Sequence, residues 1–222
     1  NKVGLVSGGG SGHLPLFTGY IGKGLLDSCA IGNVFASPSV DEISTAIKEA
    51  DSGKGVLCIY GNYGGDVMNF DMASEMLGME DIKVDSVVVA DDVASASNDE
   101  KEKRRGVTGM LYVYKIAGAM AETGASFDEV KRIAIKTNEN IRTMGIALTP
   151  TILPQAGKPT FEIADDEMEI GMGIHGEPGI RRGKLKSADE ITNELSDKIL
   201  DDINLSSGDE ISVLINSLGA TP

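Results

Sequence analysis

The sequence predicts an α/β fold, with two α/β domains built on mostly parallel sheets and the second domain truncated. Short, nearly continuous apolar runs at 2–7, 56–60 and 85–90 are typical of strands covered on both faces of a sheet. Segments with helical apolar spacing lie between and after these runs, and this alternation is typical of parallel sheets. Both of the first two runs end in a glycine-rich loop.

The first domain is expected to span residues 1–148. Its strands should alternate with helices at 40–50, 68–77, 109–122 and 127–142. Asp41 and Ser126 stand near the starts of two of these helices, where short polar side chains cap free backbone amides. This domain carries the loops GGGSGH (8–13) and NYGGD (62–66).

Residues 149–222 are predicted to begin a second α/β domain, which carries the loop GIHGEPG. Three prolines between 149 and 159 favour a connecting segment at its start. The pattern then predicts a strand at 168–174, a loop at 175–183, a helix around 188–199 and a strand at 211–215. Asn1 stands directly before an apolar run and the chain stops just after the last predicted strand, so we expect a fragment.

Bulk composition narrows the function. A net charge of −14 argues against a nucleic-acid partner, which would need clustered Lys and Arg. The sequence contains no long apolar run or secretory signal, so we expect a cytoplasmic protein with no membrane contact. Cys29 and Cys58 are isolated among apolar neighbours and are predicted to be buried, reduced thiols. The basic run Lys101–Arg105 is expected to be a solvated loop, or alternatively a docking point for an acidic partner.

The chain has two histidines, and both lie in glycine-rich loops directly after predicted strands. His13 closes GGGSGH and His175 opens HGEPG, while Asp66 ends a similar loop after the second strand. Ligands of open α/β sheets collect at the carboxyl ends of the strands, where glycine lets the backbone approach a ligand closely. The three side chains therefore predict a site for a polar ligand.

Other interpretations of these residues remain open at this stage. Each histidine could be a structural loop residue, and GGGSG could be a plain tight turn, since it matches neither GxGxxG nor a Walker A loop. The two histidines and Asp66 could hold a metal ion. No His-x-x-x-His spacing supports this, and we expect no bound metal. Ser11 lacks the G-x-S-x-G context of a nucleophilic serine.

A set of motifs running in order along the chain resembles one protein family. The motifs are VGLVSGGGSGH, NYGGDVMNFDMA, DDVAS with KRRGVTG, KIAGAMAE, GMGIHGEPG and INSLGATP. They resemble the substrate-binding subunit, or first domain, of dihydroxyacetone kinases. GMGIHGEPG and GDVMNF are its most specific elements, and the resemblance spans essentially the whole chain. It implies a two-domain α/β protein, often a homodimer, that takes part in phosphorylating dihydroxyacetone or a related short ketose.

The resemblance also implies roles for individual residues. The histidine matching His175 bonds covalently to the ketone carbon as a hemiaminal, and Asp66 accepts the proton of the terminal hydroxyl. His13 hydrogen-bonds the substrate and assists these steps. Further substrate contacts are expected from Gly10, Ser11, Gly12 and Ser37.

The phosphoryl donor is expected on a partner, because the chain shows no nucleotide motif of its own. The family places ATP or ADP with Mg on a helical partner subunit or fused domain. The chain departs from the family pattern at two positions, Leu14 and Gly61, where the family commonly has charged residues. A larger ketose, such as a tetrulose, could use the space opened at Gly61. The family also contains non-catalytic paralogues that sense dihydroxyacetone and act as coactivators of a transcription regulator, which is the alternative function.

Overall fold

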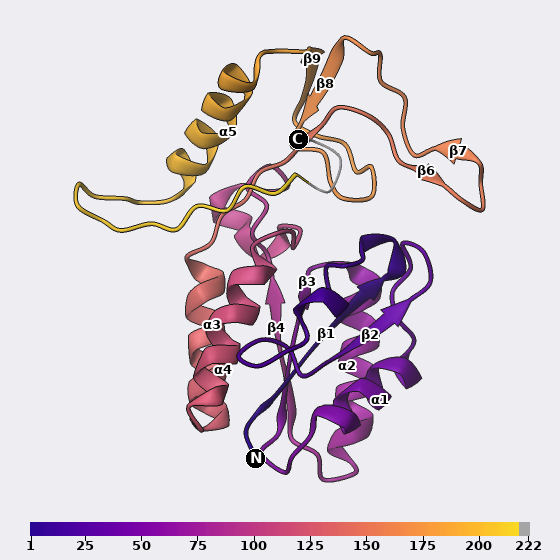
Figure 1. The fold of residues 1–222 in the computed structure, drawn as a ribbon, viewed down its shortest axis with the longest axis vertical. Coiled ribbons are helices and arrows are strands. Elements are labelled where there is room, and N and C mark those ends of the chain that lie inside the picture. The colour runs from indigo at the N-terminus through magenta and orange to yellow at the C-terminus, as the bar shows by residue number, and fades with distance from the viewer. Residues whose placement is uncertain (218–222) are drawn as a thin grey trace.

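A four-stranded parallel sheet forms the centre of the first part of the chain. The computed structural model describes residues 1–217 (Figure 1). The sheet runs in the order β2-β1-β3-β4, from the strands β1 (Gly4–Gly10), β2 (Ser28–Gly32), β3 (Val56–Gly61) and β4 (Val84–Val89). The predicted α/β class with a parallel sheet is confirmed. Strand β2 was not predicted, because Ser-Cys-Ala-Ile-Gly has only one residue that favours strands.

Helices cover both faces of this sheet. They are α1 (Val40–Ala50), α2 (Gly64–Gly78), α3 (Met110–Glu122) and α4 (Phe127–Glu139), with short 3-10 helices at η1 (Ser11–His13), η2 (Thr18–Tyr20) and η3 (Asn98–Lys103). Helices α1 and α2 lie on one side of the sheet, and α3 and α4 lie on the other (Figure 1). Ser126 caps α4 as expected, but Ser39 rather than Asp41 caps α1, through a reciprocal bond with Glu42.

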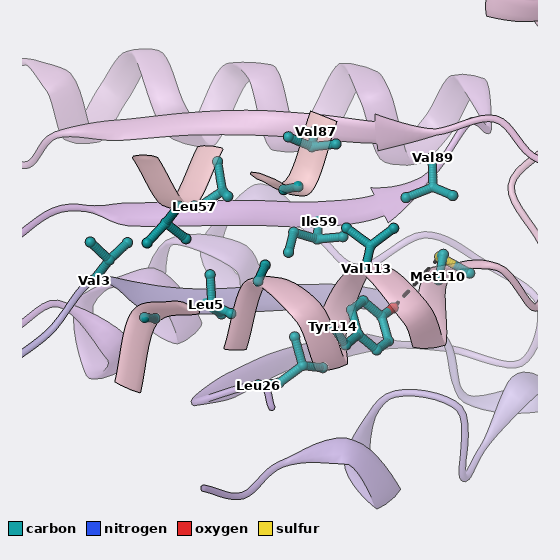
Figure 2. Packing of buried hydrophobic residues seen from close by; sticks show 14 of the residues in the cluster. Val3, Leu5, Leu26, Leu57, Ile59, Val87, Val89, Met110, Val113 and Tyr114 are labelled. Atoms are coloured by element: carbon teal, nitrogen blue, oxygen red, sulfur yellow. Dashed lines mark hydrogen bonds between the residues drawn. The ribbon is translucent and has the colours of Figure 1, made fainter. Parts of the chain in front are cut away.

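Two apolar layers fill the space between the sheet and the helices. One joins Val6, Cys58 and Tyr60 to α1 and α2. The other joins the opposite side chains of β1, β3 and β4 to α3 and α4, and Figure 2 shows Leu5 and Ile59 packed in it. Cys58 is fully buried as predicted, whereas Cys29 is only half-buried, because it lies on the edge strand β2.

The second part is built from short antiparallel strands and one helix. Its elements are β5 (Ile146–Ala147), β6 (Ile152–Leu153), β7 (Lys158–Pro159), β8 (Glu167–Ile170), β9 (Arg181–Lys184) and α5 (Ala188–Asp202). The order β5-β8-β9 is antiparallel, in contrast to the parallel pairing expected here. The connection from β8 to β9 spans only 171–180, which is too short for a crossover helix.

The strand predicted at 211–215 is wrong. This segment has no regular structure, and Ile211, Val213 and Ile215 are 59%, 74% and 91% exposed. No neighbouring strand among residues 1–217 supplies a ladder for it. The INSLGATP motif (215–222) lies partly outside the described residues, and the domain boundary at 148 stays a prediction.

Buried ion pairs join the second part to the first. The Arg104 guanidinium, 1% exposed, donates to both carboxylate oxygens of Asp202 in α5, at 2.6 and 2.8 Å. Arg142 donates to the same carboxylate at 2.5 Å. Arg105 bonds to Asp92 and to the carbonyl of Gly171 at 2.8 Å. The expectation of a solvated loop over Lys101–Arg105 is therefore wrong for its two arginines, which are structural.

No helix within residues 1–217 combines the length and the apolar character needed to cross a membrane.

Candidate functional site

The strand order places a ligand site at one edge of the parallel sheet. The chain moves from β1 to β2 on one side and then to β3 on the other, so the connections after β1 and β3 diverge. A crevice forms at such a switch point, at the carboxyl ends of the strands. His13 follows β1 in η1, and Asp66 follows β3 in the first turn of α2. The predicted glycine loops are shorter than expected, because β1 extends through Gly10 by pairing with Gly32 and α2 begins at Gly64.

The structure brings the two histidines into direct contact across 162 residues of sequence. His13 Nε2 and His175 Nε2 lie 2.9 Å apart, and their ring centroids lie 4.8 Å apart at 71°. His175 reaches this position from the loop between β8 and β9. The second part of the chain therefore supplies one of the two imidazoles of the site.

Two aromatic rings that were not predicted as site residues pack around the imidazoles. The Phe35 ring lies 4.9 Å from the His13 ring and 6.0 Å from the His175 ring. Tyr63 lies edge-on to His175 at 4.9 Å. The spacing in the sequence gives no sign of these contacts, although Tyr63 belongs to the NYGGD motif. The two rings therefore pack directly against the imidazoles.

Asp66 offers an unused acceptor to this crevice. Its Oδ1 atom is buried and has no hydrogen-bond partner among the described residues. Burial raises the pKa of Asp66, although a hydrogen bond with Ser37 and the nearby His175 oppose the rise. A buried carboxylate oxygen without a partner costs free energy unless a ligand donates to it. The arrangement therefore suits a ligand hydroxyl at Asp66.

Five of the seven expected site residues line one shared cavity of about 1740 Å³. These are Gly10, His13, Ser37, Asp66 and His175. Ser11 and Gly12 are not among its lining residues, and the Ser11 amide donates to the Asn33 carbonyl at 3.1 Å. Gly12 packs beneath Phe35, whose ring would lie 2.5 Å from an added Cβ. These two residues of the glycine-rich loop therefore contact neighbouring segments of the site and do not line the cavity.

Glu177 makes two hydrogen bonds with His175, and it was not predicted as a site residue from the sequence. Its Oε1 atom lies 2.8 Å from His175 Nδ1, and its Oε2 atom accepts the His175 backbone amide at 2.6 Å. Burial opposes ionisation of Glu177, but these hydrogen bonds outweigh it and lower the pKa of Glu177 to about 2. The signal available in the sequence was a carboxylate two positions after a loop histidine.

The surroundings of His13 disfavour its charged form, whereas those of Glu177 favour ionisation. Burial, together with the neighbouring His175, lowers the pKa of His13 to about 4, against a smaller opposing effect of Glu177. His13 is therefore neutral near pH 7 and can both donate and accept a hydrogen bond.

The described residues offer no metal centre. Within 1–217, no group of three or more His, Cys, Asp or Glu side chains is placed to hold a metal ion. The short contact between the two Nε2 atoms is a hydrogen bond, in which one imidazole donates to the other.

Gly61 lines the cavity beside Tyr63. A Cβ at this position would lie 3.1 Å from the Tyr63 ring and from the Gly106 carbonyl, so a side chain at position 61 would press against both. Leu14, the other departure from the family pattern, is 41% exposed and does not line the cavity.

The chain matches known proteins over its whole length. The Dak1 domain matches residues 1–222. The dihydroxyacetone-binding subunit of a PTS-dependent dihydroxyacetone kinase from Listeria innocua is 48% identical, covering 100% of this chain and 67% of that protein. The corresponding subunit of the PEP-dependent kinase from Escherichia coli is 41% identical, covering 100% and 69%. An L-erythrulose kinase from Pectobacterium atrosepticum is 43% identical, covering 98% and 38%.

Solved structures give the same grouping. The dihydroxyacetone kinase of C. freundii superposes with a TM-score of 0.86 at 38% identity, covering 91% of this chain and 37% of that one. A dihydroxyacetone kinase operon co-activator superposes with a TM-score of 0.85 at 37% identity, covering 91% and 62%. The chain thus spans about two thirds of the binding subunits and little over a third of the larger kinases. Matched throughout and 41–48% identical to dihydroxyacetone-binding subunits, the chain belongs to the Dak1 domain family, as its motifs indicated.

Proposed function

We propose that this chain is the ketose-binding part of a dihydroxyacetone kinase, which holds a short ketose while its terminal hydroxyl is phosphorylated. The observation that supports this most directly is the pair of imidazole Nε2 atoms, 2.9 Å apart, in one cavity with the Asp66 carboxylate, whose Oδ1 atom has no partner among the described residues. Relatives named as dihydroxyacetone-binding subunits, kinases and erythrulose kinases support the same class of substrate.

In this proposal His175 binds the ketose covalently. Its Nε2 lone pair adds to the carbonyl carbon, a C–N bond forms, and the π pair of the C=O bond moves to oxygen. The oxygen then takes one proton from solvent, which gives a hemiaminal. His13, whose Nε2 faces the same point, hydrogen-bonds that oxygen. Polyols such as glycerol lack a carbonyl and cannot form this bond, so the covalent step selects ketoses.

Asp66 is proposed as the base. Its buried carboxylate accepts the proton of the terminal hydroxyl while the hydroxyl oxygen attacks phosphorus. The raised pKa of Asp66 suits a proton acceptor, because the acceptor becomes more basic as burial disfavours its charge. Ser37 and the Gly10 backbone stand at the same cavity wall and complete the polar contacts.

The phosphoryl donor is proposed to come from another subunit or domain that carries ATP, or ADP, with Mg. A dihydroxyacetone kinase from C. freundii in complex with AMP-PNP and Mg²⁺ is similar to this chain, and the match covers 90% of this chain and 37% of that kinase. We further propose that the whole protein is cytoplasmic and homodimeric, as the family resemblance implies.

A mass measurement tests the covalent step. Dihydroxyacetone should add about its own mass to the native protein, and ¹³C NMR should show its carbonyl carbon converted to a tetrahedral carbon. His175→Ala should abolish the adduct, whereas His13→Gln should reduce its formation without moving it to another residue. Equal adduct formation by wild type and His175→Ala would refute the proposal. L-erythrulose, offered in competition, shows whether a four-carbon ketose is preferred.

A second candidate is a ligand-sensing coactivator without phosphotransfer. It is favoured by the co-activator structure, which superposes on this chain as closely as the kinase does. The full-length protein with its nucleotide-bearing partner decides between them. In a kinase, Asp66→Asn should still bind ketose, while turnover falls by at least about a hundredfold. Ketose binding by wild type without phosphotransfer would favour the sensor.

A further inference from the structure

We infer that Glu177 is a positioning residue that keeps a proton on Nδ1 of His175 and thereby leaves Nε2 without hydrogen. The Nε2 lone pair accepts from His13 in the ligand-free chain, and it can attack a carbonyl carbon once the His13 hydrogen turns to the ketose oxygen. The inference deepens the proposed function and rests on it. It is drawn from two contacts, 2.8 Å from Oε1 to His175 Nδ1 and 2.6 Å from Oε2 to the His175 amide.

The tautomer follows from counting donors and acceptors. An ionised carboxylate only accepts, so the atom that faces Glu177 Oε1, His175 Nδ1, must carry hydrogen. The Nε2 atom of the neutral ring then has no hydrogen and presents its lone pair. His13 Nε2, at 2.9 Å, is consequently the donor in the contact between the two rings. Both imidazoles have one defined tautomer because of one carboxylate.

The surrounding turn leaves Glu177 little freedom. A Cβ added to Gly173 would lie 2.1 Å from Glu177 Oε2 and 2.3 Å from Arg105 Nη1, so only glycine allows the two charged groups to approach from either side. The Glu177 carbonyl accepts the Gly173 amide at 3.0 Å. Arg105 is itself held by Asp92 and by the Gly171 carbonyl. The close packing against Gly173 and the backbone hydrogen bond therefore restrict where the Glu177 carboxylate can lie before a ligand arrives.

The same contact also assists addition. When Nε2 bonds to carbon, the ring gains positive charge while Nδ1 keeps its hydrogen. That charge develops 2.8 Å from a carboxylate, which stabilises it. Glu177 does not touch the ketose in this scheme, and it acts through His175 alone.

Glu177→Gln provides the decisive variant. The His175 backbone amide can only donate, so the new side-chain oxygen must turn toward it. The new NH₂ group must then face Nδ1, which has to become an acceptor. The proton moves to Nε2 and the lone pair is lost from the reactive nitrogen. Replacement of an orienting carboxylate by its amide costs on the order of 10⁴ in rate in a serine protease triad.

The first measurement needs no ketose. In ¹⁵N-edited NMR of the ligand-free chain, which has only two histidines, His175 should show hydrogen on Nδ1 in wild type and on Nε2 in Glu177→Gln. Glu169→Gln is the matched control, because Glu169 accepts the Gly179 amide in the same loop and an arginine instead of a histidine. This control should leave the His175 tautomer unchanged. Wild-type His175 with hydrogen on Nε2 would overturn the inference.

The second measurement is the rate of adduct formation with dihydroxyacetone, followed by native mass spectrometry. Glu177→Gln should slow it by at least about a hundredfold, while Glu169→Gln should keep it within a fewfold of wild type. If wild type forms an adduct and Glu177→Gln forms it as fast, the inference fails and the proposed function stands. If wild type forms no adduct, the proposed covalent function fails, and the tautomer measurement still judges Glu177.

Discussion

At the scale of single residues, the site depends on keeping one imidazole neutral beside another. His13 is packed between Phe35 and His175, and with the inferred tautomers it donates to His175. A proton on its second nitrogen would place a cation in a partly buried position beside a second imidazole. The lowered pKa of His13 expresses both costs, with burial as the larger one.

This arrangement predicts a specific dependence on pH. His13 should titrate near pH 4, whereas the unfolded chain should take up the same proton near 6.5. Between these values the unfolded state binds more protons, so the free energy of unfolding should fall as the pH drops from about 6.5 to about 4. Histidine NMR and urea unfolding at several pH values measure both effects. His13→Gln should remove this part of the pH dependence, and an unperturbed His13 titration would contradict the prediction.

The sequence predicts site residues where a motif contains them. His13, Asp66 and His175 follow strands in glycine-rich segments, and the structure places all three at one cavity. Glu177, Phe35 and Tyr63 were not predicted, because their roles depend on distances between segments far apart in the chain. The two arginines at 104 and 105 were predicted to be solvated for the same reason, since their partners Asp202 and Gly171 lie 66 to 98 residues further on.

At the scale of elements, the start of helix α2 decides how Asp66 meets Ser37. Gly64 and Gly65 are the first two residues of the helix and belong to the Gly-Gly pair of the NYGGD motif. An added Cβ would lie 2.6 Å from the Ser37 hydroxyl at Gly65, but would meet nothing within 4 Å at Gly64. A side chain at position 65 would therefore collide with Ser37, whereas a side chain at position 64 would meet no neighbour.

Alanine substitutions at the two glycines should therefore have different effects on ketose binding and on stability. Gly65→Ala should turn the Ser37 hydroxyl away from Asp66 and weaken ketose binding about tenfold or more, the scale of one hydrogen bond to a charged group. Gly64→Ala should leave binding unchanged and raise the free energy of unfolding by up to about 1 kcal/mol. Calorimetric titration with dihydroxyacetone and urea unfolding check both variants. Equal binding by the two would show that Ser37 does not matter.

Elements with strong periodicity were predicted well and short elements were not. Helices α1, α3 and α4 begin within one residue of the predicted positions, because their apolar spacing is set by the layer they cover. Helix α2 begins four residues early, since glycines hide the helical pattern at its start. Strand β9 lies largely in a segment predicted as a loop, and the segment 211–215, predicted as a strand, is irregular. A strand forms only where a neighbouring strand pairs with it, and a local sequence pattern does not reveal that partner.

At the scale of the whole molecule, two apolar layers cover the parallel sheet, whereas the second part combines two buried apolar side chains of β8, Met168 and Ile170, with several ionic contacts. Helix α5 has no buried residue, and its last residue, Asp202, accepts from both Arg104 and Arg142. Hydrogen bonds from Arg104 are the first cause of the lowered pKa of Asp202, and Arg142 adds to it. One carboxylate therefore neutralises a buried guanidinium and holds the helix.

Removal of that carboxylate should be costly. Asp202→Ala would leave the Arg104 cation buried without its partner, and we expect a loss of about 3 kcal/mol in the free energy of unfolding. Asp201→Ala, one residue earlier and exposed, should change it by less than about 0.5 kcal/mol. Urea unfolding with a probe in each part measures the difference. A loss for Asp202→Ala no larger than for Asp201→Ala would show that the pair is dispensable.

The contact between His13 and His175 spans these two unequally stabilised parts, and this has a consequence for exchange of backbone amides with solvent. Segments with few buried apolar contacts open at a lower free energy than the core that they rest on. Amides of β8 and β9 should therefore exchange faster than those of β1 and β3. A ketose bonded to His175 and hydrogen-bonded to His13 and Asp66 would link the two parts like a crosslink. Its binding should appear as slower exchange in β8 and β9, and the ligand would then act as a structural element of the protein that holds it.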